Sequence, residues 1–364
     1  MRLHPSFDLP DFPWDSLAGA AERARAHPGG IVDLSVGTPV DPVPPVVRAA
    51  LAGPAADDPG YPATHGTPEL REAIAGSLRR RFGVTVDPQA ILPTIGSKEL
   101  VAWLPTLLGA GPGHTVLIPE LAYPTYEVGV KLAGANPVRS DSTTAIGPGA
   151  VSMIWLNSPS NPTGKVLPVE HMAKVVAFAR ERGAIVASDE CYLSLSDGAP
   201  SILSPQVCGG SHEGLLAVHS MSKTSNMAGY RAGFVTGDPK IVAALLEVRK
   251  HAGMIVPRPV QAAMTAAAND DEHVAAQVAT YARRRETLRA AVEKAGLRVD
   301  HSTAGLYLWA TADEPCRKTV DRFAELGILV APGEFYGPAG ARHVRIALTA
   351  SDERIAAAAE RLAG

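Results

Sequence analysis

A lysine among hydroxyl side chains is the part of this chain whose residue types most clearly suggest chemistry. Lys223 follows Ser220 and Ser222, and Arg231 lies eight residues after the lysine. A lysine amine can hold an aldehyde cofactor as a Schiff base, while hydroxyls and a planar arginine can bind the phosphate of such a cofactor. The preceding apolar run, 215–218, is typical of a buried strand. Taken alone, the stretch fits a solvated loop lysine equally well.

Two further polar stretches each follow an apolar run. The stretch 157–164 contains Asn161, whose amide can donate to a phenolate oxygen, although its turn-forming residues also fit an ordinary loop. Asp189 ends the apolar run 184–188, where a carboxylate is costly unless it is paired. A pyridinium N–H would be such a partner, and Tyr192 could reach the phenolic oxygen of the same ring. A helix N-cap is the structural alternative for Asp189.

Two further stretches contain residues that could bind anions. Gly96, Ser97 and Lys98 stand where a predicted strand meets a predicted helix, and free N–H groups there can seat a phosphate. Many helices begin this way, and the Lys98 side chain fits a solvated position equally well. Arg345 lies within the apolar run 343–348, where an arginine is rarely free. It needs a carboxylate, which is either the α-carboxylate of a substrate or a structural Asp or Glu.

The elements that must position these residues alternate between strand and helix from about residue 90. This rhythm predicts a mainly parallel sheet with helices on both faces. Ligands bind at the carboxyl ends of the strands in such sheets, and each polar stretch above follows a strand. The predicted strands are 31–36, 90–95, 115–118, 151–156, 184–188, 215–218 and 232–236, and the predicted helices are 16–26, 68–82, one opening at Gly96, 126–132, 168–182 and 239–251.

The last ninety residues predict a small α+β domain. A long helix, 275–294, carries the run Arg283-Arg284-Arg285, which we interpret as a solvated helix face. It is followed by predicted strands 306–310, 328–331 and 344–348, a helix 317–326 between them, and a terminal helix from Asp352. We expect residues 1–44 to form an arm and part of the small domain, 45–272 the large domain, and 273–364 the rest of the small domain.

The N-terminal arm is rich in proline and poor in periodicity. Phe7, Phe12, Pro13 and Trp14 are expected to pack against something, which could be another subunit.

Composition excludes several classes of function. The chain has 364 residues, 46% of them hydrophobic, and a net charge of −3, so nothing favours nucleic acid or an anionic membrane as partner. It has neither an apolar run long enough to span a membrane nor a signal-peptide core at its N-terminus. Its three cysteines are far apart, which disfavours disulfides and structural zinc and favours the cytoplasm. Cys191 is interpreted as a small packing residue.

In combination, these stretches resemble the fold-type I enzymes that use pyridoxal 5'-phosphate, specifically the class I/II aminotransferases. The resemblance rests on Asn161-Pro-Thr-Gly, Asp189-x-x-Tyr, Ser-x-Ser-Lys223 and Gly-Tyr-Arg231-x-Gly, and it covers about 31–350. It implies a large domain with a mainly parallel sheet flanked by helices, a small α+β domain, and exchange of an amino group between an amino acid and a 2-oxo acid.

The family's roles carry over to matching positions. Lys223 would form the Schiff base and move the proton between Cα and C4′, Asp189 would face the pyridine nitrogen, Asn161 and Tyr192 would bind the phenolic oxygen, and Tyr123 would stack on the ring. The residues implied around the phosphate are Gly96, Ser97, Lys98 through its backbone, Ser220, Ser222, Arg231 and, from the neighbouring subunit of a homodimer, Tyr61. Arg345 would hold the substrate α-carboxylate with Gly37 and Asn161. The segment after Gly37 lacks an aromatic residue that the family often has.

The choice of substrate rests on a weaker pattern. A distal acid group would need a second cation, for which Arg249, Lys250, His251 and Arg258 are candidates, although a solvated helix end is at least as good an interpretation of the first two. Arg258 is our preferred candidate. This stretch, the short length of the chain and the loop Gly60–Gly66 resemble the actinobacterial N-succinyldiaminopimelate aminotransferases of lysine biosynthesis, which would pair with glutamate and 2-oxoglutarate. Alternatives are an aspartate, aromatic or broad-range aminotransferase, a cofactor-dependent β-lyase and a cofactor-binding regulatory domain.

Overall fold

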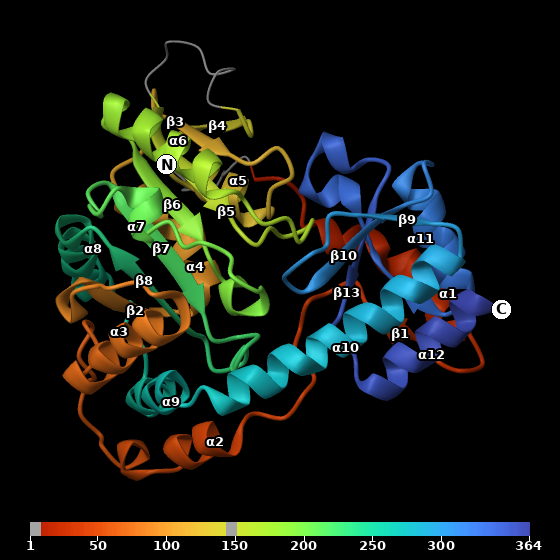
Figure 1. The fold of residues 1–364 in the computed structure, drawn as a ribbon, viewed down its shortest axis with the longest axis horizontal. Coiled ribbons are helices and arrows are strands. Elements are labelled where there is room, and N and C mark those ends of the chain that lie inside the picture. Colours follow the sequence, from red (N-terminus) through yellow and green to blue (C-terminus); the bar gives the residue numbers. More distant parts are fainter. Residues whose placement is uncertain (1–8, 143–150) are drawn as a thin grey trace, which may run out of the picture.

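The computed structural model describes residues 9–142 and 151–364 as two lobes, each built around its own sheet (Figure 1). The long helix α10 (Glu272–Lys294) runs from one lobe toward the other. Of the predicted arm residues, Phe7 lies outside the described residues. The division of the chain at residues 44 and 272 stays a prediction.

The larger lobe contains a seven-stranded sheet that is mainly parallel, and this parallel arrangement was predicted. Its strands, in spatial order, are β2 (Ile91–Ile95), β8 (Ala232–Gly237), β7 (Leu215–Ser220), β6 (Ile185–Asp189), β5 (Val151–Asn157), β3 (Thr115–Ile118) and β4 (Asn136–Arg139). Strands β3 to β7 pair in parallel, and β8 alone runs antiparallel to both its neighbours. The carboxyl ends of β5, β6 and β7 therefore lie at one edge of the sheet.

Helices cover both faces of this sheet because its strands are apolar on both sides. In β5, Ile154 and Leu156 pack into the core shared with α3, α6 and α9, whereas Met153 and Trp155 pack into the core shared with α4, α5 and α8. The helices of this lobe are α2 (Pro45–Leu51), α3 (Pro68–Phe82), α4 (Gly96–Leu107), α5 (Thr125–Leu132), α6 (Val169–Arg182), α7 (Pro205–Cys208), α8 (Pro239–Ala252) and α9 (Arg258–Asn269).

The smaller lobe is built from both ends of the described chain. Its four-stranded antiparallel sheet has the order β12 (Ala331–Pro332), β13 (Val344–Ala347), β10 (Tyr307–Thr311) and β9 (Arg298–Asp300). A separate parallel pair joins β1 (Val32–Asp33) to β11 (Ile328–Leu329). The helices that share its core are α1 (Ala18–Ala26), α10, α11 (Cys316–Glu325) and α12 (Asp352–Ala363).

Several short elements are absent from the sequence-based prediction, namely α2, α7, α9, β4 and β9. The edge strand β4 contains Pro137, which lowers its strand signal but is tolerated at a sheet edge. Helix α9 begins in a stretch whose basic residues dominate its pattern, yet the proline at its second position suits a first helical turn.

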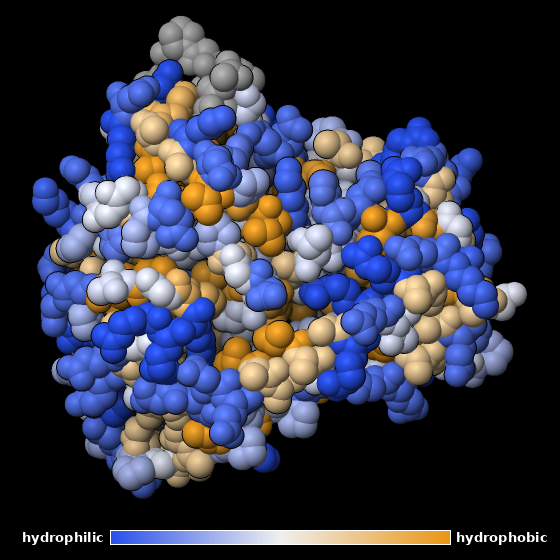
Figure 2. Space-filling model, in the orientation of Figure 1, coloured by the Kyte–Doolittle hydropathy of each residue, from blue (hydrophilic) through white to orange (hydrophobic). Residues whose placement is uncertain are grey.

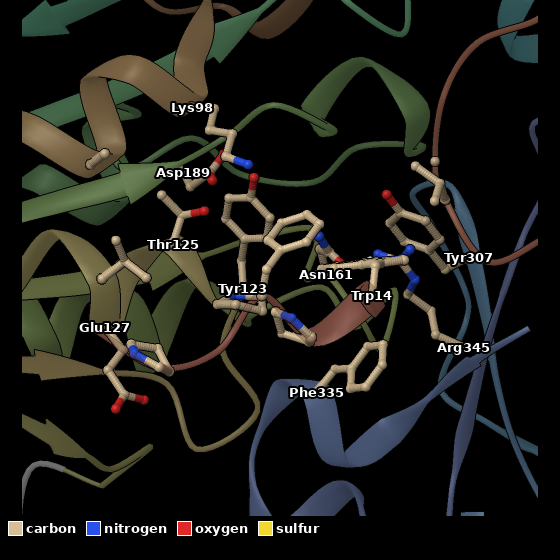
Figure 3. Close-up of a pocket in the computed structure, with 18 of the residues that line it drawn as sticks. Trp14, Lys98, Tyr123, Thr125, Glu127, Asn161, Asp189, Tyr307, Phe335 and Arg345 are labelled. Atoms are coloured by element: carbon tan, nitrogen blue, oxygen red, sulfur yellow. Dashed lines mark hydrogen bonds between the residues drawn. The ribbon is translucent and has the colours of Figure 1, made fainter. Parts of the chain in front are cut away.

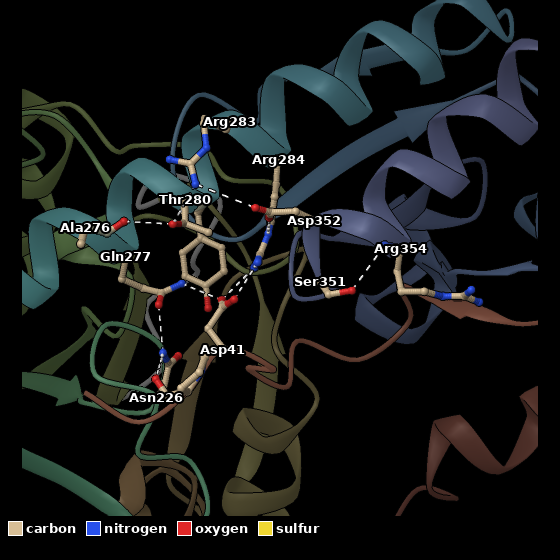
Figure 4. Close-up of polar contacts among 12 residues, drawn as sticks. Asp41, Asn226, Ala276, Gln277, Thr280, Arg283, Arg284, Ser351, Asp352 and Arg354 are labelled. Atoms are coloured by element: carbon tan, nitrogen blue, oxygen red, sulfur yellow. Dashed lines mark hydrogen bonds and ion pairs between the residues drawn. The ribbon is translucent and has the colours of Figure 1, made fainter. Parts of the chain in front are cut away.

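The interpretation of Arg283, Arg284 and Arg285 as a solvated face is wrong for two of them. Arg284 is buried and binds Asp41 with two hydrogen bonds of 2.8 and 2.6 Å, and it also pairs with Asp352 at 2.6 Å (Figure 4). Arg285 donates to the backbone oxygen of Gly305. A run of like charges does not reveal which of its members turns toward a neighbouring element.

Polar side chains predominate on the visible face of the molecule, with apolar ones scattered between them (Figure 2). Across residues 9–142 and 151–364, every helix is too short or too polar to cross a membrane.

Candidate active site

A cavity of about 1380 Å³ lies at the carboxyl ends of β6 and β7, beside the loop after β5 and the first turn of α4. The structure brings most of the predicted site residues into its lining: Gly37, Ser97, Lys98, Tyr123, Asn161, Asp189, Tyr192, Ser220, Ser222, Lys223, Arg231 and Arg345. Part of this lining appears in Figure 3, where Asp189 and Lys98 lie at one side and Arg345 and Tyr307 at the other. The cavity thus has two ends, which we name the cofactor end, around Asp189 and Lys223, and the substrate end, around Arg345.

Lys223 lies in the loop after β7, and its ammonium makes no hydrogen bond or ion pair with any described residue. Burial lowers the pKa of Lys223 to about 8, with Arg345 and Arg231 adding to the decrease and Cys191 opposing it. A lysine with a pKa this low is partly neutral near pH 7, so its amine can act as a nucleophile and as a base. The solvated-loop interpretation does not fit this environment.

Asp189, at the end of β6, is 6% exposed and has hydrogen bonds to both of its oxygens. The Tyr126 hydroxyl donates to Oδ2 at 2.7 Å, and the Cys191 backbone N–H donates to Oδ1 at 3.1 Å. Burial raises the pKa of Asp189, and these hydrogen bonds oppose that increase. No described Lys, Arg or His pairs with this carboxylate, so a pyridinium N–H has the place of the missing cation. The N-cap alternative is not realised, because Asp189 caps a turn and no helix begins there.

Tyr126 belongs to the site although the sequence analysis did not single it out. It lies in α5, is fully buried and stacks on Trp155 at 4.9 Å. Tyr126 follows Tyr123, which lies just before the start of α5, by three residues, and the two rings are in edge-to-face contact at 5.8 Å. That spacing was the available signal.

The first turn of α4 forms a seat that fits a phosphate. The N-cap, Ile95, offers no side-chain acceptor to the first N–H groups, which leaves them available for an anion. Gly96 does not itself line the cavity, but a Cβ at this position would overlap the guanidinium group of Arg231. Gly96 therefore lets Arg231 reach the helix terminus. Ser222 donates its backbone N–H to Ser220 Oγ at 3.1 Å, which fixes the third side of the seat.

One amide and one hydroxyl group could donate hydrogen bonds to the phenolic oxygen of a bound ring. Asn161 accepts a hydrogen bond from Arg345 through Oδ1 at 2.9 Å, so its amide N–H₂ points elsewhere and remains able to donate. The Tyr192 hydroxyl forms a buried 3.0 Å hydrogen bond with the hydroxyl of Tyr307. Burial raises the pKa of Tyr123 to about 12, so this ring stays neutral and can stack on a cofactor.

Arg345, on β13, is a buried cation without an acid partner. It is 2% exposed, donates to the Ser35 backbone oxygen at 2.6 Å and to Asn161, and lies over the Tyr307 ring at 4.0 Å. Among the residues the structure describes, no Asp or Glu pairs with it, so the structural-pair alternative fails. A buried guanidinium group that faces a cavity and lacks a counter-ion is built to receive a carboxylate.

Gly37 lies two residues after Ser35, the backbone partner of Arg345, and packs tightly against Tyr307. A Cβ at Gly37 would overlap the hydroxyl of Tyr307, so only glycine lets the chain cross this ring. Tyr307 was not predicted as a site residue, since nothing in the sequence links β10 with a glycine far upstream. The arm supplies further lining: Phe12 and Trp14 both face the cavity, and Trp14 packs on Phe335 at 5.3 Å.

The predicted partners for a distal acid group do not reach this cavity within one chain. Arg258 pairs with Asp58 at 3.0 Å and donates to the backbone oxygen of Tyr61 at 3.2 Å. Arg249 is fully buried and binds Glu99 at 2.9 Å, so it is neither solvated nor free. Tyr61 is 96% exposed on the outside of the lobe. The assignment of Tyr61 to the phosphate of a neighbouring subunit and that of Arg258 to a distal acid group of the substrate stay predictions.

Comparison with known proteins agrees with this geometry. Residues 30–362 match the family described as aminotransferase class I and II. The chain is 61% identical to a probable aminotransferase of Mycobacterium tuberculosis, over 98% of this chain and 86% of that protein. It is 59% identical to the 4-dedimethylamino-4-oxo-anhydrotetracycline transaminase of Streptomyces rimosus, over 98% and 99%. Among solved structures, a probable N-succinyldiaminopimelate aminotransferase from Thermus thermophilus matches with a TM-score of 0.84 and 30% identity, over 96% and 99%.

Proposed function

Because this chain belongs to the class I and II aminotransferases, whose cofactor is pyridoxal 5'-phosphate, we propose that the cavity around Lys223 exchanges amino groups between an amino acid and a 2-oxo acid by a ping-pong mechanism. The observation that carries this proposal is the pairing of a lysine of lowered pKa with a buried arginine that lacks an acid partner, in one cavity. The first suits proton transfer at Cα and the second suits the α-carboxylate beside it.

The proposed roles divide along the cavity. When bound, pyridoxal phosphate supplies a ring that withdraws the electrons released as the Cα proton leaves. Lys223 takes that proton and returns it, and Asp189 keeps the ring nitrogen protonated. Arg345 orients the substrate through its α-carboxylate, with Asn161 and the backbone of Gly37. The residues that would hold the cofactor are Gly96, Ser97, Lys98, Tyr123, Asn161, Asp189, Tyr192, Ser220, Ser222, Lys223 and Arg231.

The proposed substrate is N-succinyl-LL-2,6-diaminopimelate with 2-oxoglutarate, as in lysine biosynthesis. Three observations support it: the likeness to the Thermus enzyme, a cavity large enough for a long substrate, and a second unpaired cation. The Lys98 ammonium has no acid partner among the described residues and lies over the ring of Phe12 at 5.8 Å. Both substrates carry a distal carboxylate that needs such a cation.

We also propose that the protein works as a homodimer in the cytoplasm, with sites shared between subunits. Tyr61 is a large aromatic side chain with almost no contact in its own chain, while its loop is fixed by Arg258. An exposed aromatic residue on a braced loop is typical of a surface that a partner covers. In the dimer, Tyr61 would reach the phosphate of the neighbouring site and Arg258 a distal acid group there.

One observation favours a second candidate. The relative from Streptomyces rimosus is named for transamination of a tetracycline precursor and is twice as similar in sequence as the Thermus enzyme. A ketone on a fused ring system is therefore the alternative acceptor, with an amino acid as donor.

The first test is a substrate panel with the purified holoenzyme. Succinyldiaminopimelate, aspartate, phenylalanine, tyrosine and alanine are offered as donors to 2-oxoglutarate, and a fused-ring ketone is offered as acceptor with glutamate. The proposal expects the highest kcat/KM with succinyldiaminopimelate, about tenfold or more above the others, because among these donors it alone combines a distal carboxylate with a long chain that suits so large a cavity. An equal kcat/KM across the panel contradicts it, and preference for the ring ketone supports the alternative. Release of ammonia and pyruvate from cystathionine would indicate a β-lyase.

Arg258 is tested separately. Arg258→Ala should raise KM for dicarboxylic substrates and leave KM for alanine as it is, while Arg79→Ala, an exposed arginine away from the cavity, serves as control. Unchanged KM values for all substrates would show that Arg258 has no part in binding them.

A further inference from the structure

We propose that Trp14 is a substrate-binding residue whose indole N–H donates a hydrogen bond to the α-carboxylate held by Arg345. The inference rests on the proposed role of Arg345 and adds a ligand from the N-terminal arm, whose aromatic residues the sequence predicted only to pack. It assigns to the arm a function in binding every amino acid and 2-oxo acid that the enzyme uses.

Trp14 lies where the carboxylate must arrive. It belongs to η1 (Pro13–Leu17), lines the cavity, and its ring centre is 6.0 Å from the guanidinium carbon of Arg345. Figure 3 shows it between Asn161 and Arg345, the two side chains already linked by a 2.9 Å hydrogen bond. An anion bound to this pair therefore has the indole as its neighbour.

Two other aromatic rings hold the indole ring of Trp14 in place. Phe335, in η5 (Gly333–Tyr336), packs on it at 5.3 Å, and Phe12 packs at 5.6 Å. Arg317 donates to Ser16 Oγ at 2.9 Å and pairs with Glu334 at 2.7 Å, which anchors η1 to the smaller lobe. The indole is thus positioned before a substrate enters.

The indole N–H lacks an acceptor. Nε1 of Trp14 is buried and has no hydrogen-bond partner, although a buried donor normally has one. Trp155 Nε1 is also buried and unpartnered, but Trp155 lies in the apolar core behind the sheet, where no ligand can reach it. Trp14 differs because its unpartnered donor belongs to a ring that lines the cavity.

A carboxylate satisfies both unmatched groups at once. Arg345 is a cation without an anion, and Trp14 is a donor without an acceptor, and they lie beside each other. One oxygen of the carboxylate can accept from Arg345 and another from Trp14, so binding removes two unfavourable features with one ligand. A neutral apolar group at this point would leave both of them unmatched.

Trp14→Phe separates the hydrogen bond from the packing, because phenylalanine keeps an aromatic ring and lacks the N–H. We expect KM to rise about tenfold or more for the best amino donor and for its 2-oxo acid, as for the loss of a hydrogen bond to a charged group, with kcat within about twofold. The increase should be similar for monocarboxylic and dicarboxylic substrates. The cofactor absorption band should be unchanged. Trp103→Phe, at a partly exposed tryptophan on α4 outside the cavity lining, is the control and should match the parent enzyme.

Three results would overturn the proposal. If Trp14→Phe behaves like the parent while Trp14→Ala raises KM, the ring only packs. If KM rises for dicarboxylic substrates alone, the N–H serves the distal group and not the α-carboxylate. If the cofactor band is lost, the arm acts on the cofactor. The comparison uses whichever donor the parent enzyme turns over fastest, so a wrong choice of succinyldiaminopimelate in the proposed function leaves this test intact.

Discussion

The two ends of the cavity solve the burial of polar groups in opposite ways. At the cofactor end, Asp189 has hydrogen bonds to both oxygens from groups of its own chain. At the substrate end, Arg345 lacks a counter-ion and Trp14 lacks an acceptor. A ligand that is always present can rely on neighbours fixed around it, whereas a ligand that comes and goes must supply the missing partners itself. The unmatched Arg345 and Trp14 therefore suit a ligand that enters and leaves at each turnover.

The same contrast appears in how the two ends are assembled. Asn161, Asp189 and Lys223 each follow a strand of one sheet, so short-range patterns and the rule for parallel sheets were enough to predict them. Tyr307, Trp14 and the burial of Arg284 depend on contacts between distant segments, which no local pattern encodes. Arg345 could be predicted from the sequence because an arginine within an apolar strand is unusual whatever its distant contacts are.

Removing Lys223 should cause the largest loss of activity of any change at the cofactor end. Lys223→Ala should lower kcat by about 10⁴-fold, because no other described amine of lowered pKa faces the cavity to move the Cα proton. Steady-state rates with the best substrate pair measure this. Lys174→Ala, an exposed lysine on α6, should keep the parent rate. Residual activity above a hundredth of the parent rate would show that another base serves.

Shifting the arginine at the substrate end should affect binding and not the cofactor. Arg345→Lys keeps the charge but loses the planar pair of donors, so kcat/KM should fall about 10²-fold, mainly through KM. The absorption of the bound cofactor, followed in the same samples, should stay at its parent intensity. If cofactor binding falls by a similar factor, then Arg345 also serves the cofactor, and the two ends of the cavity do not have separate roles.

The contact between Gly96 and Arg231 tests how finely the phosphate seat is built. Gly96→Ala should weaken cofactor binding about tenfold, because the added Cβ pushes the guanidinium group away, and positive φ adds strain. Equilibrium titration of the apoenzyme with pyridoxal phosphate gives the dissociation constant. Gly83→Ala is the matched control, since Gly83 has a similar φ of 65° with nothing within 4 Å. Equal losses in both variants would mean that strain alone is responsible.

The smallest effect on activity is expected for Glu190, a buried residue that does not line the cavity and has one carboxylate oxygen without a hydrogen bond. Its Oε2 has no hydrogen-bond partner and lies 3.7 Å from His219 Nε2. Burial raises the pKa of Glu190 to about 7, so the folded state holds a proton that the unfolded state releases above its own pKa near 4.5. Stability contributed by this group is present at low pH and is lost as pH rises toward 7.

Glu190→Gln removes this titration. The unfolding free energy of the variant minus that of the parent should be about 2 kcal/mol larger at pH 8 than at pH 5. The kcat/KM of the variant should stay within about twofold of the parent value. Urea unfolding at the two pH values measures the gain. A variant with unchanged stability but altered kcat/KM would mean that unmatched buried groups outside the cavity also serve the reaction.

The meeting of β1 with β11, and of Ser35 with Arg345, has a consequence for how the protein comes into being. All strands of the larger sheet lie before residue 238, and the last helix that covers it, α9, ends at Asn269. Ser35 is made near the start of synthesis, whereas Arg345, which donates to its backbone oxygen, is made near the end. The residues proposed to hold the cofactor therefore all lie before residue 232, whereas the pair that holds the substrate carboxylate joins the two ends of the chain.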